Sequence, residues 1–62
     1  MLIYQREVIR IYDRKLAFAV AYLLGIRRPY IKSDDIGQHW VFHNNERTRE
    51  AIDYIKAFKS QQ

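Results

Sequence analysis

The sequence predicts a small α+β domain of β-α-β-β-α order, in which two helices pack on one face of a three-stranded sheet. An uncharged run at residues 16–26, LAFAVAYLLGI, has the length of a helix of about three turns. β-Branched and aromatic residues are concentrated at 7–12 and 38–43, as is typical of strands. Because 62 residues hold only one core, we expect a single domain over 1–62 with its ordered part at about 7–59.

The first element expected is a strand over residues 7–12, EVIRIY. Its alternation places Ile9 and Ile11 on one face. The opposite face then carries Val8, Arg10 and Tyr12. A competing interpretation makes residues 2–26 one long helix, because Gln5, Arg6 and Glu7 also tolerate helical structure.

A helix is expected next, between Asp13 as its N-cap and Gly25 as the residue after its C-terminus. Apolar side chains recur along it at helical spacing. The main stripe is Leu16, Val20, Leu23 and Leu24, and Phe18 and Tyr22 extend the apolar surface sideways.

Pro29 prevents the helix from continuing, and residues 29–33 and 38–43 predict a β-hairpin around the turn Asp34-Asp35-Ile36-Gly37. In it Ile31, Trp40 and Phe42 are expected to face the core. Asn44-Asn45 then caps a final helix over 46–59. The apolar stripe of that helix is Ala51, Ile52, Ile55 and Phe58, and residues 60–62 are expected to fray.

This pattern resembles a small uncharacterised domain family of Gram-positive bacteria and their phages. The segments that carry the resemblance are Tyr12-Asp13, Leu16-Ala17, residues 21–25 (AYLLG) and residues 40–42 (WVF). It implies this fold and a bacterial or phage setting, and it implies no activity and no functional residue.

Residues 23–28 and 37–42 also resemble an excisionase-type winged helix. However, the ten residues from Arg27 to Ile36, between the two glycines, cannot hold both a recognition helix and a strand.

The net charge of +4 is unevenly distributed. Residues 1–32 carry seven cations against two anions, whereas residues 33–62 carry four against five. Such a basic half is typical of a protein with a polyanionic partner, although a solvated basic surface explains it equally.

The absence of cysteine excludes disulfides and thiol chemistry. No signal peptide is evident, and the uncharged run reaches only ~16 Å against a bilayer core of ~30 Å, so we expect a cytoplasmic protein without a membrane partner.

The residues that could carry catalysis or bind metal have simpler explanations. His39 and His43 on one strand lie ~13 Å apart, too far to share a metal ion, and are expected at the surface. Asp34-Asp35 is typical of a turn. There is no Gly-rich phosphate loop and no nucleophile with a neighbouring base. We therefore expect no enzyme, no cofactor and no metal.

The sheet face turned away from the helices is the favoured binding surface, because aromatic rings on a sheet stack bases while cations hold phosphates. The sequence thus predicts a non-enzymatic binding or regulatory protein that engages nucleic acid. The expected contact residues are Arg10, Tyr12, Arg27, Arg28, Tyr30, Lys32, His39 and His43. Because so small a core favours further burial, a homodimer is expected, with Phe18 and Tyr22 at its interface. The alternative is a phage or bacterial module that modulates a host protein, or a structural homodimer without a nucleic-acid role.

Overall fold

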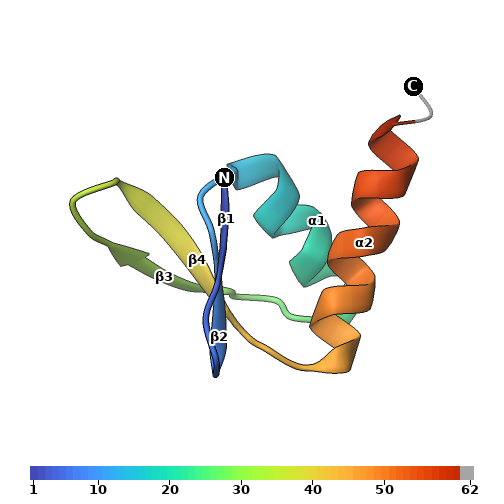
Figure 1. Ribbon diagram of the computed structural model, residues 1–62, viewed down its shortest axis with the longest axis horizontal. Helices are drawn as coiled ribbons and strands as arrows, with labels where there is room; N and C mark the ends of the chain where they lie inside the picture. Colours follow the sequence, from blue (N-terminus) through green and yellow to red (C-terminus); the bar gives the residue numbers. More distant parts are fainter. Residues whose placement is uncertain (61–62) are drawn as a thin grey trace.

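The computed structural model describes residues 1–60 and shows an α+β fold with two helices and a four-stranded antiparallel sheet (Figure 1). The elements are β1 (Leu2–Tyr4), β2 (Val8–Ile11), α1 (Arg14–Leu24), β3 (Tyr30–Ser33), β4 (Gln38–His43) and α2 (Glu46–Ser60). The predicted class and the two helices are confirmed. The prediction of three strands in β-α-β-β-α order was wrong, as was the alternative of one helix over residues 2–26. Of the tail expected to fray, Gln61 and Gln62 lie outside the described residues.

The additional strand is β1, which makes a tight hairpin with β2. Its register pairs Leu2 with Ile11 and Tyr4 with Ile9. The N–H of Gln5 donates to the Val8 carbonyl at 2.9 Å and closes the turn. The polar turn residues that allowed a helical interpretation therefore reverse the chain between β1 and β2.

The strands lie in the order β1-β2-β4-β3. Because β4 is antiparallel to both of its neighbours, β2 and β3 run in the same direction with β4 between them. The connection from β2 to β3 passes through α1, as in a split β-α-β unit. This crossover places α1 over the centre of the sheet.

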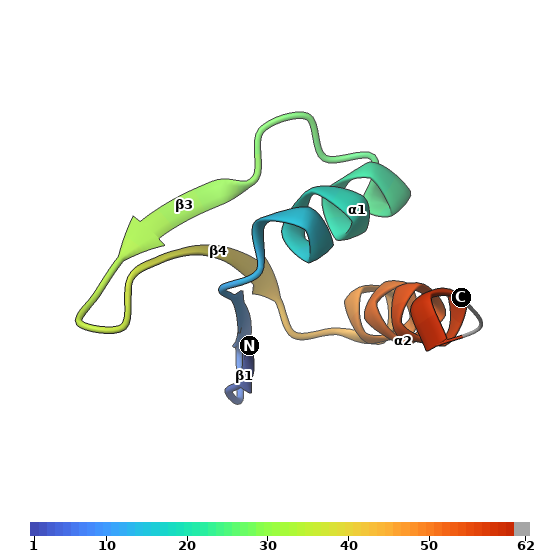
Figure 2. The same cartoon turned by 90° about the horizontal axis from the view of Figure 1, so that it is seen from above.

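The core forms where α1 meets β2 and β4. The inward-facing strand residues are Ile9, Ile11, Trp40 and Phe42, as predicted. Helix α1 meets them with small side chains, Ala17, Val20 and Ala21, together with Leu16. Helix α2 packs against α1 and completes the same cluster with Ala51, Ile52 and Ile55. Both helices therefore lie on one side of the sheet (Figure 2).

Three residues that were expected in the core are exposed. Leu23 is 45% exposed because the buried face of α1 is formed by Leu16, Ala17, Val20 and Ala21, and Leu23 lies outside it. Phe58 is 56% exposed near the end of α2. Ile31 is 50% exposed because β3 lies beyond the reach of the helices, and the turn end of the β3–β4 hairpin projects away from them in both views (Figures 1 and 2).

Both predicted caps of α1 are confirmed. The Asp13 carboxylate accepts hydrogen bonds from the N–H groups of Lys15 at 3.0 Å and Leu16 at 3.4 Å. Gly25 adopts φ +73°, the left-handed conformation that ends many helices.

Replacing Asp13 by alanine is expected to lower the free energy of unfolding by about 1 kcal/mol, because two N–H groups at the start of α1 lose their acceptor. Urea denaturation followed by circular dichroism measures this change. Asp13→Ser is the matched control: it also loses the long contact with Lys59 (3.9 Å) but keeps an N-capping oxygen, so most of the stability should remain. Equal losses in both variants would contradict the capping role.

Candidate functional site

The face of the sheet opposite the helices carries no helix in the described part of the chain, residues 1–60. One row of side chains crosses all four strands on it, from Ile3 through Arg10 and Val41 to Tyr30. Val8 and His43 form a second row, and His39 and Lys32 form a third. This open face combines an apolar centre with cationic and aromatic edges.

Asp34 organises one end of the open face from the β3–β4 turn. Its carboxylate accepts hydrogen bonds from the Tyr12 hydroxyl at 2.6 Å and from an Arg10 guanidinium nitrogen at 3.3 Å. It also accepts the backbone N–H groups of Ile36 at 2.9 Å and Gly37 at 3.2 Å. The turn role predicted for Asp34 is confirmed, and the same carboxylate fastens the hairpin to the end of β2.

The hydrogen bond between Asp34 and Tyr12 shifts the pKa values of both residues. The pKa of Asp34 is lowered below its ordinary value, and the hydrogen bond from Tyr12 is the largest cause. The N–H groups of Gly37 and Ile36 lower this pKa further, whereas burial of the carboxylate raises it. The same hydrogen bond raises the pKa of Tyr12 above its ordinary value. Asp34 is therefore ionised and Tyr12 protonated at neutral pH, which is the state the hydrogen bond requires.

His39 is part of this cluster and is only 1% exposed, so its predicted position at the surface was wrong. The Tyr12 ring covers it at 4.6 Å between ring centroids. Its Nδ1 lies 3.2 Å from the Gly37 carbonyl and 3.8 Å from the Asp34 carboxylate. Because a carbonyl only accepts, Nδ1 carries the hydrogen. The alternation of β4 did place His39 on the outer face, but contacts from the hairpin turn and the end of β2 bury it.

A hollow of about 410 Å³ lies at the other end of the open face. Its apolar lining comes from Val8, Val41, Ile26, Pro29 and Phe42. Tyr30, Arg28 and His43 also line it and add aromatic and polar groups. Tyr30 is 61% exposed, and Lys32 Nζ lies 5.5 Å from the centroid of its ring.

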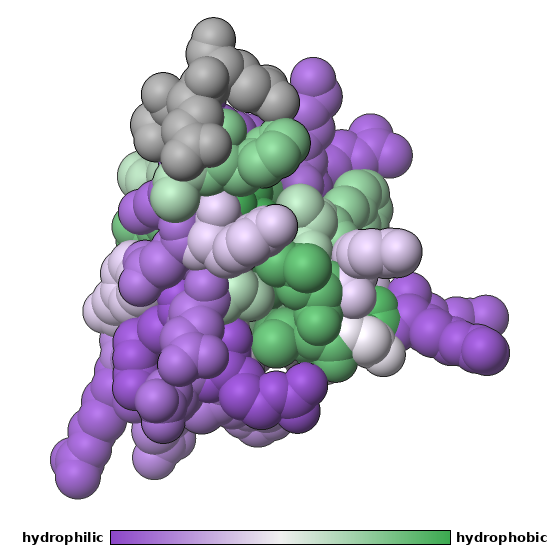
Figure 3. Space-filling model, turned by 90° about the vertical axis from the view of Figure 1, so that its right-hand side faces the viewer, coloured by the Kyte–Doolittle hydropathy of each residue, from purple (hydrophilic) through white to green (hydrophobic). Residues whose placement is uncertain are grey.

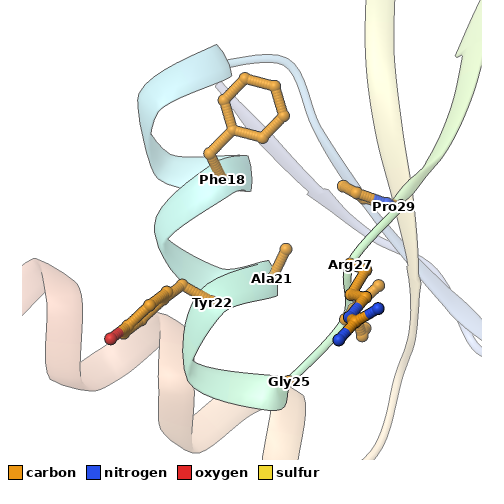
Figure 4. A pocket seen from close by; sticks show the side chains of 7 residues that line it. Phe18, Ala21, Tyr22, Gly25, Arg27 and Pro29 are labelled. Atoms are coloured by element: carbon orange, nitrogen blue, oxygen red, sulfur yellow. The ribbon is translucent and has the colours of Figure 1, made fainter.

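The structure separates the predicted contact residues into three groups. Arg28, Tyr30, Lys32 and His43 gather around or beside the hollow with side chains open to solvent. Arg10, Tyr12 and His39 are engaged by the hairpin turn. Arg27 lines a second hollow of about 480 Å³ beside α1, which shares Ile26 and Pro29 with the first (Figure 4). Alternation along the strands had placed Val8 and Val41 on this outer face, but they were not predicted as contact residues.

The two residues predicted at a dimer interface lie on α1. Phe18 is 45% exposed, and its ring meets the edge of Trp40 at 5.6 Å between centroids, so part of it belongs to the fold. Tyr22 is 84% exposed. Both line the hollow that contains Arg27 and Pro29, with α1 as one wall and the following loop as the other (Figure 4). Their role at an interface stays a prediction.

Apolar side chains also gather on the outer side of the helices. Figure 3 shows this area beside the polar strip of α2. Its residues include Ala19, Tyr22, Leu23, Tyr54 and Phe58, which line a groove between α1 and α2. Tyr54 is 65% exposed.

Within residues 1–60, no three histidine, aspartate or glutamate side chains lie together as a metal site would require. None of the described helices has the length and apolarity needed to cross a membrane. Comparisons with protein-family models, curated proteins and solved structures found no match to this chain. The family resemblance therefore stays a prediction, and function must be argued from the geometry.

Stability should depend on Asp34 at acidic pH. Because its folded-state pKa is lowered, its contribution is present above its unfolded value, near 3.8, and is lost as pH falls further through the folded-state pKa. We expect the free energy of unfolding to fall more steeply below about pH 4 in the natural protein than in Asp34→Asn. Tyr12→Phe should make this fall at acidic pH partly less steep, since it removes the largest cause of the lowered pKa of Asp34.

Urea denaturation of the three proteins at a series of pH values measures this difference. Asp53→Asn is the matched control, because Asp53 is exposed on α2, far along the chain from the cluster. If the free energy of unfolding falls equally at acidic pH in the natural protein and in Asp34→Asn, the hydrogen bonds of Asp34 do not stabilise the hairpin.

Proposed function

We propose that this protein binds single-stranded nucleic acid on the open face of its sheet. The observation that carries the proposal is the hollow lined by Val8 and Val41, which also contains an exposed Tyr30 ring and the Arg28 side chain. Apolar and aromatic side chains accept the flat face of a base, and a neighbouring cation accepts the phosphate that follows it.

Tyr30 is the aromatic residue best suited to stacking. It is more than half exposed, and it lies on β3 beside Val41 of β4 in the sheet register. The ammonium of Lys32 stays on the same face, close to the ring. The Tyr12 ring, in contrast, covers His39 and its hydroxyl is bound to Asp34, so it is held in place within the protein.

The charges that support the proposal are Arg28 and Lys32. Neither forms an ion pair within residues 1–60, whereas Arg10 on the same face is paired with Asp34. Unpaired cations are available to replace the counterions of a phosphate backbone. They also account for part of the positive excess of residues 1–32.

A single strand fits this face better than a duplex. Stacking on a sheet requires bases whose faces are exposed, which only unpaired nucleotides offer. Within residues 1–60 both helices lie on the other side of the sheet, so the open face presents no helix to enter a major groove.

A protein-interaction module is the second candidate, and the apolar groove between α1 and α2 favours it. Exposed Tyr22, Tyr54 and Phe58 are the kind of side chains that cluster in protein interfaces. Purification of partners from bacterial lysate with nuclease treatment separates the two functions: a stoichiometric protein partner lost on Tyr54→Ala would favour this candidate, and a partner lost on nuclease treatment would favour nucleic acid.

Tyr30→Ala is expected to weaken single-strand binding by about 5- to 150-fold, because one stacked base contributes ~1–3 kcal/mol. Fluorescence anisotropy with a labelled single-stranded oligonucleotide at low salt measures this change. Tyr54→Ala is the matched control, since Tyr54 is equally exposed but lies on α2. Equal affinities for both variants, or no binding by the natural protein at low salt, would contradict the proposal.

Arg28→Glu should weaken binding to all sequences alike and should reduce the salt dependence of the association constant, because it removes one phosphate contact. The same titration repeated at several salt concentrations gives the slope. Lys56→Glu makes the same charge change on α2, away from the open face, and should leave the slope nearer to that of the natural protein. If the two variants change the slope equally, only overall charge matters.

A further inference from the structure

Strand β3 ends the sheet with an uncovered edge. Within residues 1–60 it pairs only with β4, and all four of its residues are exposed. Ile31 faces the side of the helices but lies beyond them, half exposed. Exposed strand edges are templates for pairing with another strand.

The backbone groups on this edge can be assigned from the register. The N–H of Asp34 donates to the Gly37 carbonyl at 3.2 Å, so Asp34 points toward β4. Antiparallel pairing alternates along a strand, so Tyr30 and Lys32 also point toward β4. The N–H and carbonyl groups of Ile31 and Ser33 therefore point outward, without a strand partner in the described part of the chain.

We propose that a second copy of this chain pairs antiparallel with this edge, about a two-fold axis that passes beside Ile31. In this register Ile31 lies opposite Ile31 of the other copy, Tyr30 lies opposite Lys32, and Pro29 lies opposite Ser33. The two Ile31 residues then exchange two hydrogen bonds, and each Ser33 N–H meets a Pro29 carbonyl. Pro29 has no N–H, so the Ser33 carbonyl opposite it has no donor, but this gap falls at the two ends of the pairing and not beside the axis.

The neighbouring symmetric registers are less favourable. A shift that centres the axis on Lys32 places the two ammonium groups opposite each other on one face, where like charges destabilise pairing. A shift that centres it on Tyr30 places Pro29 opposite Ile31, so the Ile31 carbonyl finds no donor. The register about Ile31 instead sets Lys32 beside the Tyr30 ring of the other copy, a pairing that occurs within one chain at 5.5 Å.

Charge at the two ends of β3 favours a second copy as the partner. Arg27 precedes the strand and Asp35 follows it, and both are exposed. Antiparallel pairing about Ile31 brings the Arg27 end of each strand toward the Asp35 end of the other. Neither side chain has an ion pair within residues 1–60, so antiparallel self-pairing supplies complementary charge at both ends.

The exposed turn residue Ile36 also finds a place in this arrangement. It is 58% exposed at the tip of the hairpin. Antiparallel pairing also brings this tip toward the loop before β3 of the other copy, which contains Ile26 of the hollow beside α1 (Figure 4). The dimer would thus cover apolar side chains that a single chain leaves in water.

The pairing has a consequence for the open face. A two-fold axis perpendicular to the sheet keeps the helices of both copies on one side, so the two open faces join into one surface. Tyr30 and Lys32 of both copies then lie at its centre. The dimer itself does not rest on the proposed function, because it is measured without nucleic acid.

Sedimentation velocity of the full chain over its soluble concentration range is the test. Since four backbone hydrogen bonds and two ion pairs make a small interface, we expect a concentration-dependent monomer–dimer equilibrium. Ile31→Pro removes an N–H that β4 does not use and should give a monomer. Circular dichroism checks that this variant is folded.

Charge reversal tests the register without altering the backbone. Arg27→Asp and Asp35→Arg should each weaken the dimer about tenfold, because two attractive pairs become repulsive. The double variant should restore the dimer to within about threefold of the natural protein. Lys56→Asp on α2 makes the same charge change as Arg27→Asp and should leave the dimer unaffected.

Three results would overturn the proposal. The natural protein would be monomeric at every concentration, the double variant would fail to restore a dimer that the single variants weaken, or a dimer would persist unchanged in Ile31→Pro and Arg27→Asp. The last result would place self-association on another surface, such as the groove between α1 and α2.

Discussion

The packing of α1 onto the centre of the sheet is the interaction on which the rest of the structure depends. Ala17 and Ala21 are small enough to bring the helix close to β2 and β4, where Trp40 and Phe42 fill the remaining space. Helix α2 then completes the core mainly from the far side of α1. Because α1 is the helix that lies closest to the central strands, β3 extends beyond the covered area, and the opposite face carries no helix in the described residues. Both proposed binding surfaces, the open face and the free edge of β3, exist because the helices leave these parts of the sheet uncovered.

A polar cluster supports the part of the sheet that the core does not reach. Asp34 joins the hairpin turn to Tyr12 and Arg10, and the buried ring of His39 fills the space beneath. A charged residue at this position does more than shape a turn, because it fixes the hairpin relative to β2. The orientation of Tyr30 and Lys32 depends on that attachment, so the cluster positions the open face and the free edge together.

The sequence predicted the elements whose signals are local. Asp13, Gly25 and Asn45 mark helix ends, and alternation at Ile9, Ile11, Trp40 and Phe42 marks the core face. It did not predict β1, because a polar turn without glycine, Gln5 to Glu7, is equally compatible with a helix. The burial of His39 and the exposure of Ile31 depend on residues from other elements, which periodicity along one strand does not contain. Tertiary cover, and not local pattern, decides such positions.

The central claim is that the face left without helices is the surface that binds. Chemical-shift mapping by NMR with a short pyrimidine-rich single strand tests it residue by residue. We expect the largest backbone amide shifts at residues 28, 30–32 and 41–43, with small changes along α2. Shifts concentrated at 54–59 and on the outer side of α1, or none at low salt, would contradict it and would move the functional surface to the groove between the helices.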